Sequence, residues 1–177
     1  AANPVYYYIQ FQTGNWLLSA KGDKETCQTA SLHNGNLDDM LWRVSEKDGK
    51  YSFVSKSGKI LYISDSYVNA AKARNVKDTL FTMVESNNSL GGFEIGKSTT
   101  GRNFFNMFQG AGEGRLISFW DLGDGGNVVR FVPAEELVPV SGIATFNPAN
   151  KYTLWYTKPA TNWMTSCLPI GNGQFGA

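Results

Sequence analysis

LWRVSEKDGKYSFVSKSG, residues 41–58, is the stretch of sequence that decides the fold. Apolar residues occupy alternate positions at Trp42 and Val44, acidic residues and a glycine follow, and alternation resumes at Tyr51 and Phe53. Alternation at every second residue on both sides of a glycine-containing turn is typical of two short antiparallel strands with one buried face. The stretch therefore predicts a β-hairpin.

The same pattern returns at two other places with nearly constant spacing. Three kinds of position recur: a buried residue in the first strand, a turn glycine 3 to 6 residues later, and an apolar pair in the last strand. In chain order they are Phe11, Phe53 and Ile95; Gly14, Gly58 and Gly101; and Trp42 with Val44, Phe81 with Met83, and Val129 with Phe131. A repeat in this size range predicts repeated structural units. We place the units at residues 5–47, 48–88 and 89–137.

Three small strand units can hide their exposed edges by closing around a pseudo-threefold axis. Over residues 5–137 the chain resembles a β-trefoil of the ricin B-like lectin type. The predicted fold class is therefore all-β, a β-trefoil of three pseudo-repeats of about 42 residues that occupies residues 1–137. Trp42, Phe81 and Phe131 are expected to share one core. Residues 70–80, at the position of the third strand of the second unit, are expected to be loop and strand.

Composition excludes several classes of partner. Net charge is +1 with basic and acidic residues intermingled, which is not the footprint of a nucleic-acid-binding protein. No apolar run approaches the roughly 18 residues that a membrane span requires. The opening residues, AANP, do not show the charged start and apolar stretch that are typical of a signal peptide.

The sequence contains no clear catalytic motif and no set of residues with the spacing of a metal site. His33 is the only histidine and no nucleophile motif accompanies it, so a loop position is expected rather than a general base. Two distant cysteines, Cys27 and Cys167, cannot supply a zinc site. We predict no catalytic residue, no metal and no cofactor, and leave open whether the two cysteines pair.

Each unit carries residue types that suit a shallow sugar site. A saccharide presents rows of hydroxyls and one apolar ring face, which match carboxylates or amides beside a flat aromatic ring. The candidate sets are Trp16 with Asn36 and Asp38; Tyr67 with Asp65 and Asn69; and Trp120 with Asp121, Asp124 and Asn127. The lectin resemblance implies sugar sites of this make-up, although the Gln-x-Trp motif common in that family is missing here. The alternative is that the polar residues shape turns and the aromatic rings fill the barrel.

Composition changes after Leu137, because residues 138–177 contain no Asp or Glu and four of the six prolines. Such a change indicates a domain boundary, so we predict a linker at residues 138–150 and an extended arm beyond it. Residues 151–177 are expected to form the truncated first strand and hairpin of a second domain. An exposed strand at 152–156 could also pair two molecules into a dimer.

The arm has a second family resemblance, carried by LWYTKPATNWMTSCLPIGNGQFGA at residues 154–177. The matching residues are Leu154, Trp155, Tyr156, Pro159, Ala160, Trp163, 168–173, Gly176 and Ala177. This stretch resembles the start of the N-terminal β-sandwich of glycoside hydrolase family 95, the inverting α-L-fucosidases. The resemblance implies a truncated enzyme that is secreted, cell-surface or periplasmic. Its catalytic domains would follow in the same polypeptide.

Together these patterns predict a non-catalytic carbohydrate-binding module that holds a fucosidase-like enzyme near its glycan. Tethering of this kind raises the local substrate concentration even when each site is weak. A fucosylated oligosaccharide is the candidate ligand that the resemblance implies. The alternative is a structural spacer that packs on the enzyme's own domains and binds no sugar.

Overall fold

The computed structural model describes residues 4–21, 26–64, 66–72 and 76–137. The predicted linker at 138–150, the predicted strand and hairpin at 151–177, Cys167 and Asp65 lie outside these ranges. The domain assignment of the arm and the dimer that it could form stay predictions. Everything below concerns the described residues.

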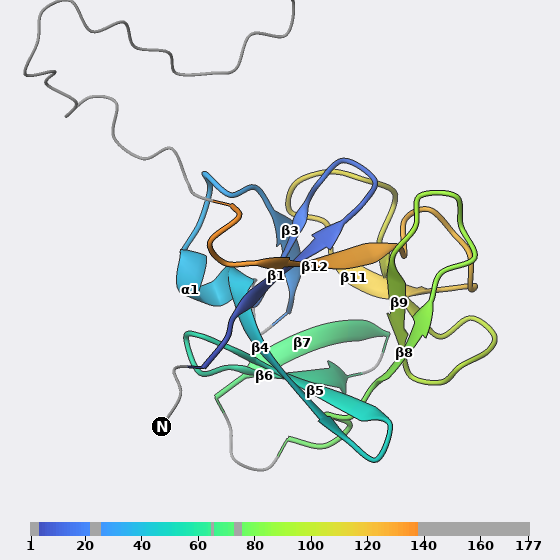
Figure 1. The fold of residues 1–177 in the computed structure, drawn as a ribbon, viewed down its shortest axis with the longest axis horizontal. Coiled ribbons are helices and arrows are strands. Elements are labelled where there is room, and N and C mark those ends of the chain that lie inside the picture. Colours follow the sequence, from blue (N-terminus) through green and yellow to red (C-terminus); the bar gives the residue numbers. More distant parts are fainter. Residues whose placement is uncertain (1–3, 22–25, 65, 73–75, 138–177) are drawn as a thin grey trace, which may run out of the picture. The chain divides into compact units, whose positions relative to one another are not determined.

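Each predicted unit contains four strands (Figure 1). In the first unit they are β1 (Tyr7–Phe11), β2 (Leu17–Ser19), β3 (Gln28–Ala30) and β4 (Leu41–Lys47), with a one-turn helix, α1 (Leu37–Met40), before β4. The second unit holds β5 (Lys50–Ser55), β6 (Ile60–Ser64), β7 (Tyr67–Ala71) and β8 (Thr82–Glu85). The third holds β9 (Phe93–Gly96), β10 (Phe104–Met107), β11 (Ile117–Trp120) and β12 (Val129–Pro133).

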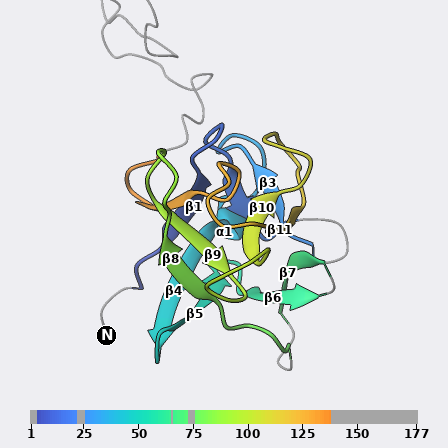
Figure 2. The same cartoon turned by 90° about the vertical axis from the view of Figure 1, so that its right-hand side faces the viewer.

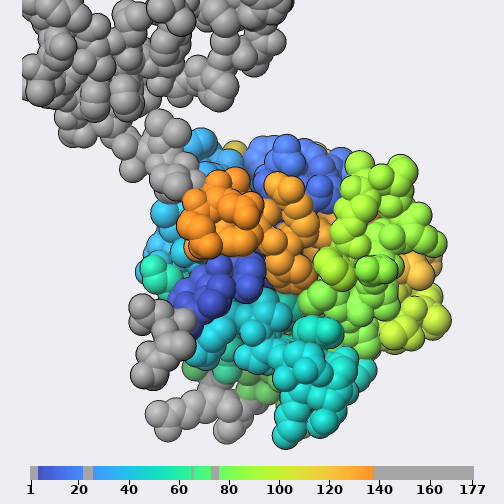
Figure 3. Space-filling model, viewed as in Figure 1, coloured from blue at the N-terminus to red at the C-terminus, as the bar shows by residue number. Residues whose placement is uncertain are grey.

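The first and fourth strands of the three units form a closed barrel. Antiparallel pairs join β1 to β4, β4 to β5, β8 to β9, β9 to β12, and β12 to β1. The remaining gap, between β5 and β8, is bridged by Tyr51 and Phe81, whose backbone N–H groups each donate to the other's carbonyl at 2.9 Å. Closure leaves no free barrel edge. Figure 2 shows β8 beside β9, and Figure 3 shows strands from all three units meeting on one face.

The second and third strands of each unit form the hairpins β2–β3, β6–β7 and β10–β11. Six barrel strands and three hairpins, in threefold order along the chain, constitute a β-trefoil. The predicted fold class is confirmed.

The core contains the residues that share the repeat spacing. Those of the first barrel strands, Phe11, Phe53 and Ile95, and those of the last, Trp42, Phe81 and Val129, are all buried in one cluster. Phe131 is partly buried, packs against this cluster, and stacks on Phe53 with ring centroids 6.3 Å apart. The expectation that Trp42, Phe81 and Phe131 share a core is therefore confirmed.

The three turn glycines also behave alike. Gly14, Gly58 and Gly101 have φ angles of +82°, +86° and +72°, in the left-handed region that glycine enters without steric penalty. Each of these glycines thus lies, with a positive φ, in the loop between the first and second strands of its unit.

The third strand of the second unit is β7, Tyr67–Ala71, and it pairs along its whole length with β6. It overlaps the predicted loop-and-strand stretch at residues 70 and 71, and the other described residues of that stretch are not strand. The helix α1 was not expected from the sequence. Its first turn is capped by Asn36, whose side-chain Oδ1 accepts a hydrogen bond from the backbone N–H of Asp38 at 3.0 Å.

Candidate functional site

The hairpin registers identify equivalent positions in the three units. The first cross-strand pair is Leu17 with Ala30, Ile60 with Ala71, and Phe104 with Trp120. In each hairpin the next residue of the first strand, Leu18, Leu61 or Phe105, is buried in the shared core, which confirms the alignment. Trp120 thus occupies a position that is alanine in the other two units. Only the third unit places a large flat ring there.

A hollow of about 710 Å³ lies beside Trp120. This volume is in the range of small-molecule sites, roughly 300–1,000 Å³. Trp120 is 43% exposed, so part of its ring remains open to solution. The other lining residues are Thr13, Ser66, Lys97, Arg102, Asn106, Met107, Phe108, Gln109, Gly110, Ala111, Ser118, Phe119, Asp124 and Gly126.

Asp124 is held in the wall of this hollow by two hydrogen bonds to one of its oxygens. Its Oδ1 accepts from the backbone N–H of Gly126 at 2.7 Å and from Nδ2 of Asn106 at 3.1 Å. The side chain is exposed, and within the described residues nothing donates to its Oδ2. A carboxylate oriented in this way can accept hydrogen bonds from hydroxyl groups of a ligand.

A chain of hydrogen bonds continues from Asp124 into the protein. Asn106 Nδ2 also donates to Oδ1 of Asn127 at 2.8 Å, and Asn127 Nδ2 donates to Oε2 of Glu94 at 2.9 Å. Asn127 and Glu94 are both fully buried. The surface carboxylate is therefore connected to a fixed buried one.

Glu94 in turn holds the loop that carries Asp124. Its two oxygens accept from the backbone N–H of Gly123 at 3.0 and 3.1 Å, and Oε1 accepts from the hydroxyl of Ser86. Asn127 Nδ2 also donates to the backbone carbonyl of Asp121 at 2.7 Å. A buried carboxylate satisfied by several donors fixes the backbone around it, so the loop at 121–127 is preorganised.

Two cations stand over aromatic rings at the hollow. The guanidinium carbon of Arg102 lies 3.4 Å from the centroid of Trp120, and Nζ of Lys97 lies 3.8 Å from that of Phe119. Both distances are within cation–π range. One face of the indole is thus occupied by a guanidinium group.

The structure places some of the predicted residues of the third unit in the lining of the hollow and others outside it. Trp120 and Asp124 line the hollow, whereas Asp121 is exposed but does not line it. Asn127 is fully buried, its amide holds the loop, and it does not line the hollow. Sequence reasoning missed Asn106, Lys97 and Arg102. The available signal was Asn106 itself, a polar residue within the apolar strand FFNM.

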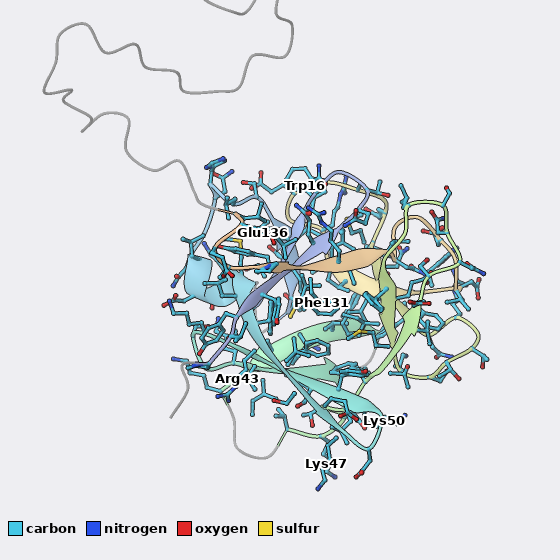
Figure 4. All side chains as sticks on the ribbon, in the orientation of Figure 1. Trp16, Arg43, Lys47, Lys50, Phe131 and Glu136 are labelled. Carbon is cyan, nitrogen blue, oxygen red and sulfur yellow. The ribbon has the colours of Figure 1, made fainter. Side chains whose placement is uncertain are left out.

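The candidate set of the first unit does not form a site. Trp16 is partly buried against the core. Asn36 caps α1, and Asp38 pairs with Nζ of Lys56 at 3.2 Å. Figure 4 shows Trp16 near the loop between β1 and β2, away from the position of α1 in Figure 1.

In the second unit, Tyr67 meets Phe108 edge to face at 5.9 Å, which places it next to the rim of the hollow. Asn69 is buried, and its Nδ2 donates to the backbone carbonyl of Tyr67 at 3.3 Å. Asn69 does not line the hollow, and its role as a sugar ligand stays a prediction. Asp65, the third member of this set, is outside the described residues.

A smaller hollow of about 420 Å³ lies along the β2–β3 hairpin, and Ala30 occupies the place that Trp120 has in the third unit. Its lining includes no Trp, Tyr or Phe, and the exposed His33 lies in its wall, in a loop as expected. Across the described ranges, no three His, Cys, Asp or Glu side chains gather closely enough to hold a metal ion. Within the same ranges, no helix has the length and apolar character needed to cross a membrane.

The sequence matches no family model and no curated protein. Similar solved structures include the designed threefold-symmetric protein ThreeFoil, at 18% identity and a TM-score of 0.58 over 72% of this chain and 97% of that one. The ricin B-like lectin of Macrolepiota procera in complex with lactose has 14% identity and a TM-score of 0.60 over 75% and 97%. An endo-β-galactosidase of Clostridium perfringens that releases GlcNAcα1-4Gal has 12% identity and a TM-score of 0.60, over 73% of this chain and 32% of the enzyme. At these identities the likeness establishes the fold, a β-trefoil of the kind found in ricin B-like lectins.

Proposed function

We propose that this β-trefoil is a non-catalytic module that binds carbohydrate in the hollow beside Trp120. The observation that supports it best is the pairing of a partly exposed indole with an oriented, exposed carboxylate, Asp124, in one concave surface. An apolar sugar face can lie against the open part of the ring while hydroxyls donate to the carboxylate. The lactose complex of the similar Macrolepiota procera lectin supports this assignment.

The wider role that we propose is that of an accessory module in a secreted or cell-surface glycoside hydrolase. Its support is the resemblance of residues 154–177 to the start of α-L-fucosidases of family 95, and the occurrence of a similar fold within the Clostridium perfringens enzyme. A module of this kind raises the concentration of glycan near the catalytic domains. A fucosylated oligosaccharide is then the first ligand to test.

A structural spacer is the second candidate. It is favoured by three exposed apolar side chains of the third unit, those of Leu90, Phe93 and Leu122. Such side chains would be covered if the trefoil packed on another domain of the same polypeptide. A spacer requires no sugar site, so glycan binding separates the two candidates.

The test is a glycan array that includes neutral galactosides, N-acetylgalactosaminides and fucosylated oligosaccharides, followed by calorimetry with the best ligand. Trp120→Ala should weaken binding by about tenfold or more, because a ring contact with the sugar is lost. Phe93→Leu is the matched control, since Phe93 is similarly exposed, at 37%, but does not line the hollow.

Two results would contradict the proposal. One is the absence of binding to any glycan at millimolar concentration. The other is equal loss of affinity in Trp120→Ala and Phe93→Leu, which would place the ligand elsewhere. Far-ultraviolet circular dichroism of both variants would show that the trefoil is intact.

A further inference from the structure

The wall of the hollow carries more positive charge than a neutral sugar requires. Its charged residues are Lys97, Arg102 and Asp124, two cations and one carboxylate. The ion pairs among the described residues are Lys56 with Asp38 and Lys59 with Asp39, so neither cation of the hollow has a carboxylate within 4.0 Å. Both are exposed, and both could bind a further anion without first breaking an ion pair.

The loop that presents these cations is internally braced. Lys97 N donates to the backbone carbonyl of Asn103 at 2.9 Å, and Asn103 Nδ2 donates to Ser98 Oγ at 3.0 Å and to the carbonyl of Thr100 at 2.7 Å. The hydroxyl of Thr82 donates to the carbonyl of Ser98 at 2.8 Å, which fastens the loop to β8. The backbone positions of both cations are thus set before a ligand arrives, which lowers the entropic cost of binding.

Each cationic group of the hollow lies over an aromatic ring of β11, Lys97 over Phe119 and Arg102 over Trp120. Both rings, both cations and Asp124 line the same hollow. The guanidinium fork of Arg102 offers paired N–H donors, which match the oxygens of a carboxylate or a sulfate. Asp124 offers only acceptor oxygens, which match sugar hydroxyls.

We propose that the hollow selects a sugar that bears an anionic group, either the carboxylate of an acidic sugar or a sulfate ester. Arg102 and Lys97 bind the anionic group, and Asp124 binds hydroxyls of the same ligand. This inference rests on the proposed carbohydrate binding at the same site and adds the charge class of the ligand.

The experiment compares lactose with two anionic derivatives of it, 3′-sulfated lactose, which adds only a sulfate ester, and 3′-sialyllactose, which adds an acidic sugar, with sodium sulfate alone as a fourth arm. An array with neutral, sialylated and sulfated versions of other glycans extends the comparison. Calorimetry on the full chain should show at least one charged form binding about tenfold or more tightly than its neutral parent, the gain that charge-assisted hydrogen bonds provide. The gain should shrink at high salt, since the cations are exposed.

The variants are Lys97→Gln and Arg102→Gln, separately and together, and the readout is the ratio of the charged ligand's affinity to that of its neutral parent in the same variant. Each variant should lower this ratio, and the double variant should lower it most. Lys97→Gln leaves the Arg102–Trp120 contact in place, so its effect does not depend on the position of the indole. Arg43→Gln with Lys50→Gln is the matched control. It makes the same change in net charge at exposed residues of β4 and β5, neither of which lines the hollow.

The outcomes separate this inference from the proposed function. Equal binding of neutral and charged forms would overturn the inference and leave carbohydrate binding standing. A charge advantage that the control pair removes as fully as the site variants would also overturn it. Binding of sulfate alone without binding of any sugar, or no binding at all, would contradict both. The sialylated and sulfated arms show which anion is the source of the preference.

Discussion

Replacement of Trp42 by alanine tests the barrel core most severely. Its indole is fully buried among residues of all three units, and Nε1 donates to the backbone carbonyl of Leu18 at 2.9 Å. A buried aromatic side chain removes roughly 150–250 Å² from water, worth about 4 to 6 kcal/mol at about 25 cal/mol per Å². Residual burial in the unfolded chain reduces this figure to about 3 to 5 kcal/mol, the range found for such truncations.

A loss of this size is a large part of the free energy of unfolding of an ordinary domain, about 5 to 15 kcal/mol. Urea denaturation followed by circular dichroism, with linear extrapolation to water, would measure it. The control is Trp120→Ala, at a ring that is 43% exposed, for which we expect about 1 kcal/mol or less. If the two variants unfold within about 1 kcal/mol of each other, the assignment of Trp42 to the core is refuted.

Three further predictions concern other parts of the structure. Glu94→Gln replaces a carboxylate oxygen, which accepts hydrogen bonds, by an NH₂ group that faces other donors. It should lower the free energy of unfolding by about 1 to 3 kcal/mol in urea melts and weaken glycan binding. Glu136→Gln, at an exposed residue, is the control and should do neither. Burial raises the pKa of the Cys27 thiol, and Lys59 lowers it by a smaller amount. The thiol therefore ionises at lower pH in the unfolded chain than in the folded one, so the free energy of unfolding should fall above about pH 9. In melts at about pH 8 to 10, Cys27→Ala should show a smaller loss of stability with rising pH. Gly58→Ala should lower the free energy of unfolding by about 1 to 2 kcal/mol through the positive φ of this residue alone. Gly14→Ala should lower it more, because a new Cβ would also lie 2.7 Å from Trp16 Nε1. Equal thermal midpoints for the two variants would count against the described turn.

The fold was predictable because its signal is repeated. A single alternating stretch such as Tyr51 to Phe53 could belong to many β-proteins. Recurrence of Phe11, Phe53 and Ile95 at one spacing ties the three units to a common core, and the structure buries all three. A helix of one turn has no such periodic signal, which is why α1 was missed.

The site was predictable only in part, because it combines segments that are separated along the chain. Trp120 and Asp124 are close in sequence and both line the hollow. Lys97 and Arg102 join them through strand pairing, in which Phe104 lies opposite both Gly96 and Trp120. Sequence proximity alone cannot reveal such pairings.

Some polar residues were assigned to sugar sites because they lie in the same sequence unit as an aromatic ring, whereas the structure gives them contacts within the fold. Asn36 serves a helix cap and Asp38 an ion pair, and Asn127 is buried beneath the loop that it holds. Each is a residue type that could bind a sugar hydroxyl, and each makes a contact within the fold. Which amide faces solution depends on burial, and burial is a property of the folded chain.

The most direct test of the account is a titration followed by the ¹H–¹⁵N signals of the tryptophan indole groups. With the best ligand from the glycan array, the Trp120 signal should shift and saturate. The Trp42 signal should stay in place because that indole is buried and bonded to Leu18, and the Trp16 signal should change little. A saturable shift at Trp16 with none at Trp120, or no shift at any indole at millimolar ligand, would contradict a carbohydrate site in the third unit.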